Sequence, residues 1–333
     1  MLYVVIVFLW ASICLYLLLG GADFGAGILE LAAPRKHRPR INAIMSKAIG
    51  PIWEANHMWL IIAIVILFVG FPDVYTTMSI YVHLPLTAML LGIIARGTAF
   101  VFRHYDAIED HWQGIYARIF TWSSMITPFF LGVIAAATVS RSIDPEADGF
   151  IAAYIDSWLT VFGVTIGLFT VAICGYLASA YALGTVTEQK DQTLIVRMAK
   201  RFIVAVVFAG ALVFAAAFYS GIPLTNWIFG GIVGQLAIAT ATLSLALTFV
   251  AFRRRNASAV RILAGFQVVM ILLAATYQHY PVLILFRNGD GLSLIEHAEN
   301  TKTITALAWT LLLGSILILP FLFYLMRVFG KRM

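Results

Sequence analysis

Nine long apolar segments constrain the fold of this chain more than any other feature of its sequence. They lie near residues 2–22, 51–71, 75–95, 119–139, 158–183, 202–220, 227–252, 262–285 and 304–326. Each approaches the roughly 20 residues that an α-helix needs to cross the apolar core of a bilayer. Because a membrane-spanning helix satisfies its own backbone hydrogen bonds, the sequence predicts an all-α integral membrane protein with nine transmembrane helices.

The composition supports this class and argues against a nucleic-acid partner. Hydrophobic residues make up 62% of the chain and charged residues only 11%, with a mean hydropathy of +0.93. The formal net charge is +6, but most Lys and Arg residues lie in or beside alternate connections and in the C-terminal tail. The positive-inside rule then predicts an outside N-terminus and a cytoplasmic C-terminus. The expected surroundings are therefore a lipid bilayer.

Short connections between the segments predict helix bundles without a separate soluble domain. The acidic, turn-forming stretch RSIDPEADG at 141–149 follows the fourth segment. A division there predicts a first four-helix bundle over 1–140, a second four-helix bundle over 141–285, and an outer loop with a ninth helix over 286–333.

The first apolar segment carries an acid among small residues. Its motif GGADFGAG (20–27) places Asp23 between glycines. Gly21 and Gly25 form a small-xxx-small pair, which lets a helix approach another backbone closely. Glu30 follows Asp23 by seven residues, or two turns along nearly the same face. We interpret the glycines as helix-packing residues, whereas Asp23 requires a partner.

The second segment begins with GPIWEANHMW (50–59), which places Glu54, Asn56 and His57 ahead of a long apolar run. An ionisable side chain at membrane depth costs roughly 2.5 kcal/mol or more. Glu54 and His57 are three residues apart, so they lie on one helix face. Because of this energetic cost, we expect these polar side chains to have a structural or functional role.

The predicted topology places Asp23, Glu54 and Arg96 at one depth, because Arg96 lies in ARGTAFVFRHY (95–105) at the end of the third segment. Two interpretations remain open. In one, a salt-bridged lock holds the first bundle together. In the other, a proton pathway from the cytoplasm uses Glu54 as an acceptor near Asp23, with Asn56 and His57 as hydrogen-bonding neighbours. Structural or charge-pairing roles are assigned to Trp53, Arg96, Arg103 and Glu30.

Metal and disulfide chemistry are not indicated. Cys14 and Cys174 lie in apolar segments without CxxC spacing, and we expect them to be core residues. His57, His83 and His279 are the candidate haem ligands inside apolar segments. A lone histidine on an apolar helix is more often hydrogen-bonded than metallated, so we predict no catalytic residue and no metal ligand in this chain.

The three motifs together resemble subunit II of the cytochrome bd-type quinol oxidases, including their cyanide-insensitive branch. The resemblance rests on GGADFGAG, GPIWEANHMW and ARGTAFVFRHY, with nine segments and an outside N-terminus. GPIWEANHMW is the most specific of the three motifs, whereas the last five segments match mainly by hydropathy.

This resemblance implies a respiratory terminal oxidase of the bacterial cytoplasmic (inner) membrane that oxidises quinol and reduces dioxygen to water. It implies that haem b, haem d and the quinol site belong to a partner, subunit I, and that this chain is haem-free. It also allows for a small single-helix subunit and a structural quinone. By resemblance, Glu54 after Trp53 is the acid of a proton path towards the haems, and Asp23 and Arg96 match the family's helix 1 acid and helix 3 arginine.

The chain departs from the family pattern at several positions. Some members have Asp, Gly and Gln where this chain has Glu54, Ala55 and His57, and another acidic position of some members falls here near Arg118. These differences affect the expected length and acidity of the proton path.

Two other classes are alternatives. An ion-coupled secondary transporter also uses paired intramembrane acids and glycine-broken helices, although its acids tend to occupy both halves and the second half here has almost no internal charge. A purely structural scaffold would keep the complex together and tolerate every charge-neutralising substitution.

Overall fold

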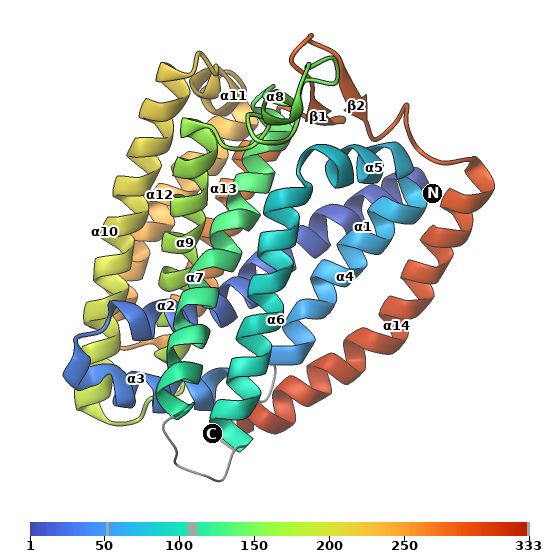
Figure 1. Cartoon of the computed structure of the whole chain (residues 1–333). Coiled ribbons are helices and arrows are strands. Elements are labelled where there is room, and N and C mark those ends of the chain that lie inside the picture. Colours follow the sequence, from blue (N-terminus) through green and yellow to red (C-terminus); the bar gives the residue numbers. More distant parts are fainter. Residues whose placement is uncertain (51–52, 106–111, 332–333) are drawn as a thin grey trace.

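The computed structural model describes residues 1–50, 53–105 and 112–331. Within this part of the chain, nine helices are long and apolar enough to cross a membrane, as the sequence predicts. Figure 1 shows the long helices running side by side between two ends of the molecule, with the two termini at opposite ends. That placement agrees with an odd number of spans, whereas the side of the membrane on which each terminus lies stays a prediction.

The first half contains four spans. The first span is continuous through three elements, of which the middle one is a π-helical turn. A short helix, α3, precedes the second span. In order, the elements are α1 (Leu2–Leu15), η1 (Tyr16–Gly20), α2 (Gly21–Ala32), η2 (Arg35–His37), α3 (Arg38–Ile49), α4 (Trp53–Gly70), α5 (Pro72–Tyr81), α6 (His83–Tyr105) and α7 (Trp112–Val139).

The second half contains five spans and a small antiparallel hairpin at the end that also holds the N-terminus (Figure 1). Its elements are α8 (Phe150–Tyr154), α9 (Val161–Ala182), α10 (Gln189–Tyr219), α11 (Leu224–Phe229), α12 (Ile232–Arg253), α13 (Ala257–Thr276), β1 (Val282–Leu285), β2 (Gly291–Ser293) and α14 (Thr301–Lys331).

The third span begins later than the sequence predicts. The segment 75–95 is divided, because α5 ends at Tyr81 and the spanning helix α6 begins at His83. Pro85 has no N–H to donate to the carbonyl of Tyr81. Instead, the hydroxyl of Ser157 donates to that carbonyl over 2.8 Å. The break between α5 and α6 therefore arises from the missing N–H of Pro85, and the loop residue Ser157 stabilises it by a hydrogen bond.

The eighth span ends earlier than the sequence predicts. The apolar run 262–285 includes residues that leave the helix, because α13 ends at Thr276 and Val282–Leu285 form β1, which pairs with β2. Hydropathy alone does not separate a buried strand from the end of a helix. The second predicted segment, 51–71, begins at residues 51–52, which lie outside the described residues; α4 occupies 53–70.

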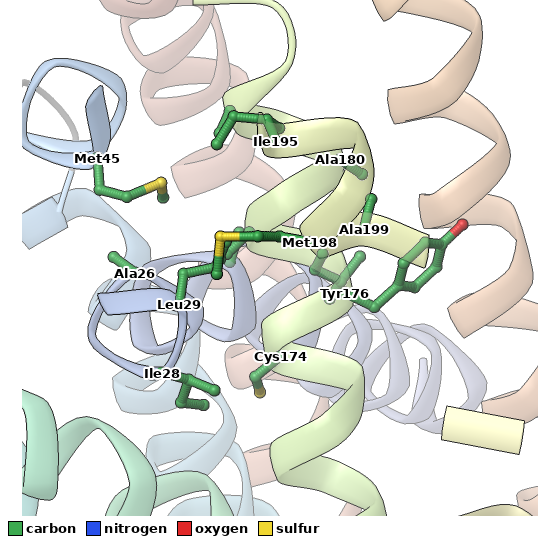
Figure 2. Close-up of a cluster of buried hydrophobic side chains, with 14 of the residues drawn as sticks. Ala26, Ile28, Leu29, Met45, Cys174, Tyr176, Ala180, Ile195, Met198 and Ala199 are labelled. Atoms are coloured by element: carbon green, nitrogen blue, oxygen red, sulfur yellow. The ribbon is translucent and has the colours of Figure 1, made fainter. Parts of the chain in front are cut away.

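The largest buried cluster lies where α2, α3, α9 and α10 meet. Figure 2 shows Leu29 of α2, Met45 of α3 and Met198 of α10 directed towards one another beside α9. Cys14 and Cys174 are buried free thiols. Because this cluster joins helices from both sides of residue 140, the division at 1–140, 141–285 and 286–333 stays a prediction about sequence organisation.

Candidate functional site

A buried ion pair joins the first and third spans. Arg96 on α6 places Nη1 2.7 Å from Oδ2 of Asp23 on α2, and its Nη2 donates to Oδ1 over 2.7 Å and to the backbone carbonyl of Asp23 over 3.0 Å. Arg96 and Asp23 are 1% and 0% exposed. Nε of Arg96 donates to the hydroxyl of Ser124 on α7 over 3.2 Å. Each member of the pair therefore has a counter-charge and hydrogen bonds at a depth where an unpaired charge is costly.

His57 extends this pair towards α4. Its Nε2 lies 3.6 Å from Oδ2 of Asp23, and its ring packs against Tyr16 and Phe24 at centroid distances of 6.1 and 5.6 Å. Tyr16 belongs to the π-helical turn of the first span, an irregularity that is frequent at functional sites. Asp23 therefore faces one fixed cation and one titratable ring.

The remaining residues of GPIWEANHMW occupy different environments. Asn56 is 5% exposed, and the Trp53 ring packs on Phe100 at 5.4 Å between centroids. Glu54 is exposed on the surface of α4 and makes no ion pair with any described residue. Asp23, and not Glu54, is thus the acid that pairs with Arg96, although Glu54 precedes His57 by only one helical turn.

A second ion pair between α2 and α6 joins Glu30 and Arg103. Each of its members follows a member of the first pair by seven residues, or about two helical turns. Arg103 donates to both carboxylate oxygens of Glu30, over 2.9 and 2.7 Å. Each pair joins residues 73 positions apart, so α2 and α6 keep the same register through both contacts. A small pocket between the pairs is lined by four polar side chains, Glu30, Arg96, Asn42 and Ser46, with apolar neighbours.

We expect Arg103→Lys to lower stability by about 1 kcal/mol, because lysine cannot reproduce the two parallel hydrogen bonds of the guanidinium. Thermal unfolding of the purified protein measures this change. Arg197→Lys is the matched control, since Arg197 is exposed and has no ion pair within the described chain. Equal melting temperatures for both variants would show that the Arg103–Glu30 geometry contributes nothing.

The predicted packing glycines lie against α9. A Cβ at Gly25 would lie 2.0 Å from the carbonyl oxygen of Cys174, and one at Gly21 would lie 3.3 Å from the Leu177 side chain. Gly27 faces the other way, where a Cβ would lie 2.3 Å from the Ser124 hydroxyl of α7. Gly25 therefore fixes a direct backbone contact between α2 and α9, next to Asp23.

Several polar contacts were not foreseen from the sequence. Arg40 of α3 forms a bidentate contact with Asp191 at the start of α10 and lies 3.1 Å from Glu188. These acids raise the pKa of Arg40, first through the hydrogen bond to Asp191, so it stays charged. In the second half, the Tyr176 hydroxyl donates to Gln267 over 2.8 Å, and Gln267 donates to Thr248 over 3.0 Å. A motif gives no signal for partners so far apart in the chain.

The three candidate histidines of the apolar segments are each in contact with protein groups. The ring of His57 is packed between aromatic rings and faces Asp23. Nδ1 of His83 lies 2.7 Å from the carbonyl of Ile80, and the ring of His279 packs edge-on against Trp227 at 4.3 Å. Among the described residues, no three His, Cys, Asp or Glu side chains gather to hold a metal.

The fold and site together define a class: a polytopic α-helical membrane protein whose first, second and third spans converge on a buried ion pair and a histidine. Comparisons narrow this class further. The family model of cytochrome bd terminal oxidase subunit II matches residues 1–329. The chain belongs to this family, and it is a multi-pass protein of the bacterial inner membrane.

Two individual proteins with similar sequences carry the same subunit name as the family. The chain is 30% identical over 204 residues to cytochrome bd ubiquinol oxidase subunit 2 of Bacillus subtilis, covering 60% of this chain and 58% of that protein. It is 25% identical over 217 residues to cytochrome bd-I ubiquinol oxidase subunit 2 of Escherichia coli K12, covering 62% of this chain and 56% of that protein. These alignments thus span little more than half the length of either relative.

A solved structure shares the fold. A chain of the bd oxidase from Geobacillus thermodenitrificans superimposes with a TM-score of 0.77 at 18% identity, with 98% of each chain covered. At this identity the likeness concerns the fold alone. It confirms the all-α, nine-span architecture over nearly the whole chain.

Proposed function

We propose that this chain is the haem-free subunit of a terminal oxidase complex that oxidises quinol and reduces dioxygen to water. The family match over residues 1–329 carries the proposal. We assign the haems and the quinol site to a partner subunit by the family resemblance. The contacts of His57, His83 and His279 with protein groups support this assignment for the haems. An ion-coupled transporter gains no support from this family.

The surface of α4 supports assembly with that partner. Glu54 is exposed there, and Ile61, Val65 and Phe68 are exposed further along the same helix. A carboxylate in a membrane span is expected to face protein or water and not lipid chains. A partner subunit that covers α4 satisfies this requirement and brings Glu54 to the interface.

The polar residues give this chain a second role, in proton uptake. The pocket beside Arg96 opens between α2, α3 and α6, and Asp23 lies behind Arg96 in contact with His57. Glu54 lies one turn from His57, on the side facing the proposed partner. The proposed route therefore runs from the pocket through Asp23 and His57 to Glu54, with Asn56 as a buried polar neighbour.

We expect Glu54→Gln to lower oxygen consumption by the assembled complex at least about a hundredfold, the lower range of effects for a group that transfers protons. The amide keeps the size of the side chain but cannot carry the proton. Quinol-driven oxygen uptake, measured over a range of pH with the haem spectrum recorded on the same sample, tests this.

Glu146→Gln is the matched control, because Glu146 is exposed in the loop at the opposite end of the molecule. Normal haem content with unchanged turnover in Glu54→Gln at every pH would rule out Glu54 as a carrier. Loss of haem would assign Glu54 to assembly. Tolerance of neutral replacements at Glu54, Asp23 and His57 alike would favour the scaffold.

A further inference from the structure

The second half of the chain carries a group of cations without matching acids. No Asp or Glu occurs between Asp191 and Asp290. The hydrogen bonds from Arg261, near the start of α13, to the carbonyl of Tyr181, at the end of α9, bring the α9–α10 and α12–α13 turns to the same end of the molecule. Six exposed cations lie in the first half of α10 and at the α12–α13 turn, namely Arg197, Lys200, Arg201, Arg253, Arg254 and Arg255. None of the six forms an ion pair with a residue that the structure describes.

On α10 these cations continue into an exposed apolar stripe. Seven residues, or two turns, separate each cation from an apolar side chain on nearly the same face. The three apolar residues are Val204, Val207 and Phe208, which are 67%, 59% and 64% exposed. The face of α10 therefore changes from cationic to apolar between Arg201 and Val204, about three to four turns from the start of the helix at Gln189.

On α12 the apolar residues come first along the chain and the cations follow, because this helix runs in the direction opposite to α10. Leu243, Leu247 and Val250 are 64%, 49% and 45% exposed. Arg254, directly after the last helical residue, follows Leu247 by seven positions and is exposed. Two separate helices thus present apolar side chains along the span and, towards the same end, guanidinium or ammonium groups that pair with no described acid.

We propose that this surface, formed by the six cations and the two stripes, binds anionic phospholipid. The phosphate of such a lipid supplies the counter-charge that the described residues lack here, while its acyl chains lie along the apolar stripes. Clusters of several cations next to a membrane span attract anionic lipid in this way, and long basic side chains reach the interface while their stems stay in apolar surroundings. A zwitterionic headgroup offers no net counter-charge, so the surface should discriminate between the two lipid types.

The test uses the purified oxidase complex with its full chain, in detergent. Native mass spectrometry counts retained lipid after exposure to equal amounts of phosphatidylglycerol and phosphatidylcholine, and thermal unfolding records the stabilisation by each. We expect R253Q/R254Q/R255Q to reduce the preference for phosphatidylglycerol about tenfold, whereas R253K/R254K/R255K retains it.

The matched control is R35Q/K36Q/K47Q, which removes three exposed cations at the same end, beside α3. The proposal predicts less than about a threefold change there, because α3 has no spanning stripe above these residues. If the glutamine variant does not assemble, raising salt from about 0.1 M to about 1 M on the unaltered complex decides the question, since screening should abolish the preference.

Three outcomes would overturn the proposal. The preference for phosphatidylglycerol could survive both the glutamine variant and high salt. The control variant could lose as much preference as the test variant, which would indicate diffuse attraction. The glutamine variant could release a protein subunit with no change in retained lipid, which would assign the surface to a protein contact.

Discussion

Replacing Arg96 with methionine is expected to destabilise the protein by about 3–5 kcal/mol, the cost of leaving one member of a buried ion pair without its partner. Asp23 is 0% exposed, and Arg96 supplies its counter-charge. A loss of this size is a large fraction of the stability of a typical protein. The yield of assembled complex and its thermal unfolding measure it, with Arg35→Met as the control at an exposed cation.

The double variant Asp23→Leu/Arg96→Met separates the lock from the proton pathway. Replacing both members of a buried pair with apolar side chains is often neutral or stabilising, so the double variant should regain most of the lost yield. Turnover should nevertheless stay low, because leucine carries no proton to His57. Recovery of both yield and turnover would leave the pair a purely structural role and would contradict the proposed route.

The second large effect is expected from Gly25→Ala, which should destabilise the protein by about 3 kcal/mol, the upper part of the usual range for overpacking. The new Cβ would lie 2.0 Å from the Cys174 carbonyl oxygen and 2.5 Å from the Ala178 Cβ. Because the nearer atom is backbone, α2 must move away from α9, and Asp23 moves with it. Thermal unfolding and oxygen uptake of the complex should therefore both fall.

Gly314→Ala provides the control within a spanning helix, since a Cβ built there meets no side chain and no backbone beyond its own helical turn within 4 Å. Alanine is the better helix former by roughly 1 kcal/mol, so this variant should be unchanged or slightly more stable. Ala178→Gly should not rescue Gly25→Ala, because it leaves the carbonyl contact in place. A rescued melting temperature would show that the side chain, and not the backbone, sets the approach of the helices.

Motif reading predicted that the first three spans meet at charged residues, and Asp23 and Arg96 do meet. It did not predict that His57 faces Asp23 while Glu54 faces outward. Residues three apart on a helix differ by about 60° in direction, so a boundary between a buried and an exposed face can pass between them. The sequence also did not predict that Ser124 accepts a hydrogen bond from Arg96 or that Asn42 and Ser46 line the pocket. A single hydroxyl or amide in an apolar or basic segment is too common to indicate a contact.

Hydropathy located the spans but not all of their ends. Pro85 divides α5 from α6, and its effect depends on a carbonyl that the hydroxyl of Ser157 satisfies from a distant loop. The hydropathy of the last residues of the run 262–285 is compatible with either a helix or a strand. They form β1 by pairing with β2, which lies outside that run.

The sequence by itself determined the membrane class, the number of spans and the segments in which charge is scarce, because transfer into a bilayer depends on each segment separately and is roughly additive along it. Only the tertiary structure decided which acid meets which base. Asp23 with Arg96 and Glu30 with Arg103 each join residues 73 positions apart. Their pairing depends on the register between α2 and α6, which the close approach of α2 to α9 at Gly25 helps to set, and no single segment encodes it.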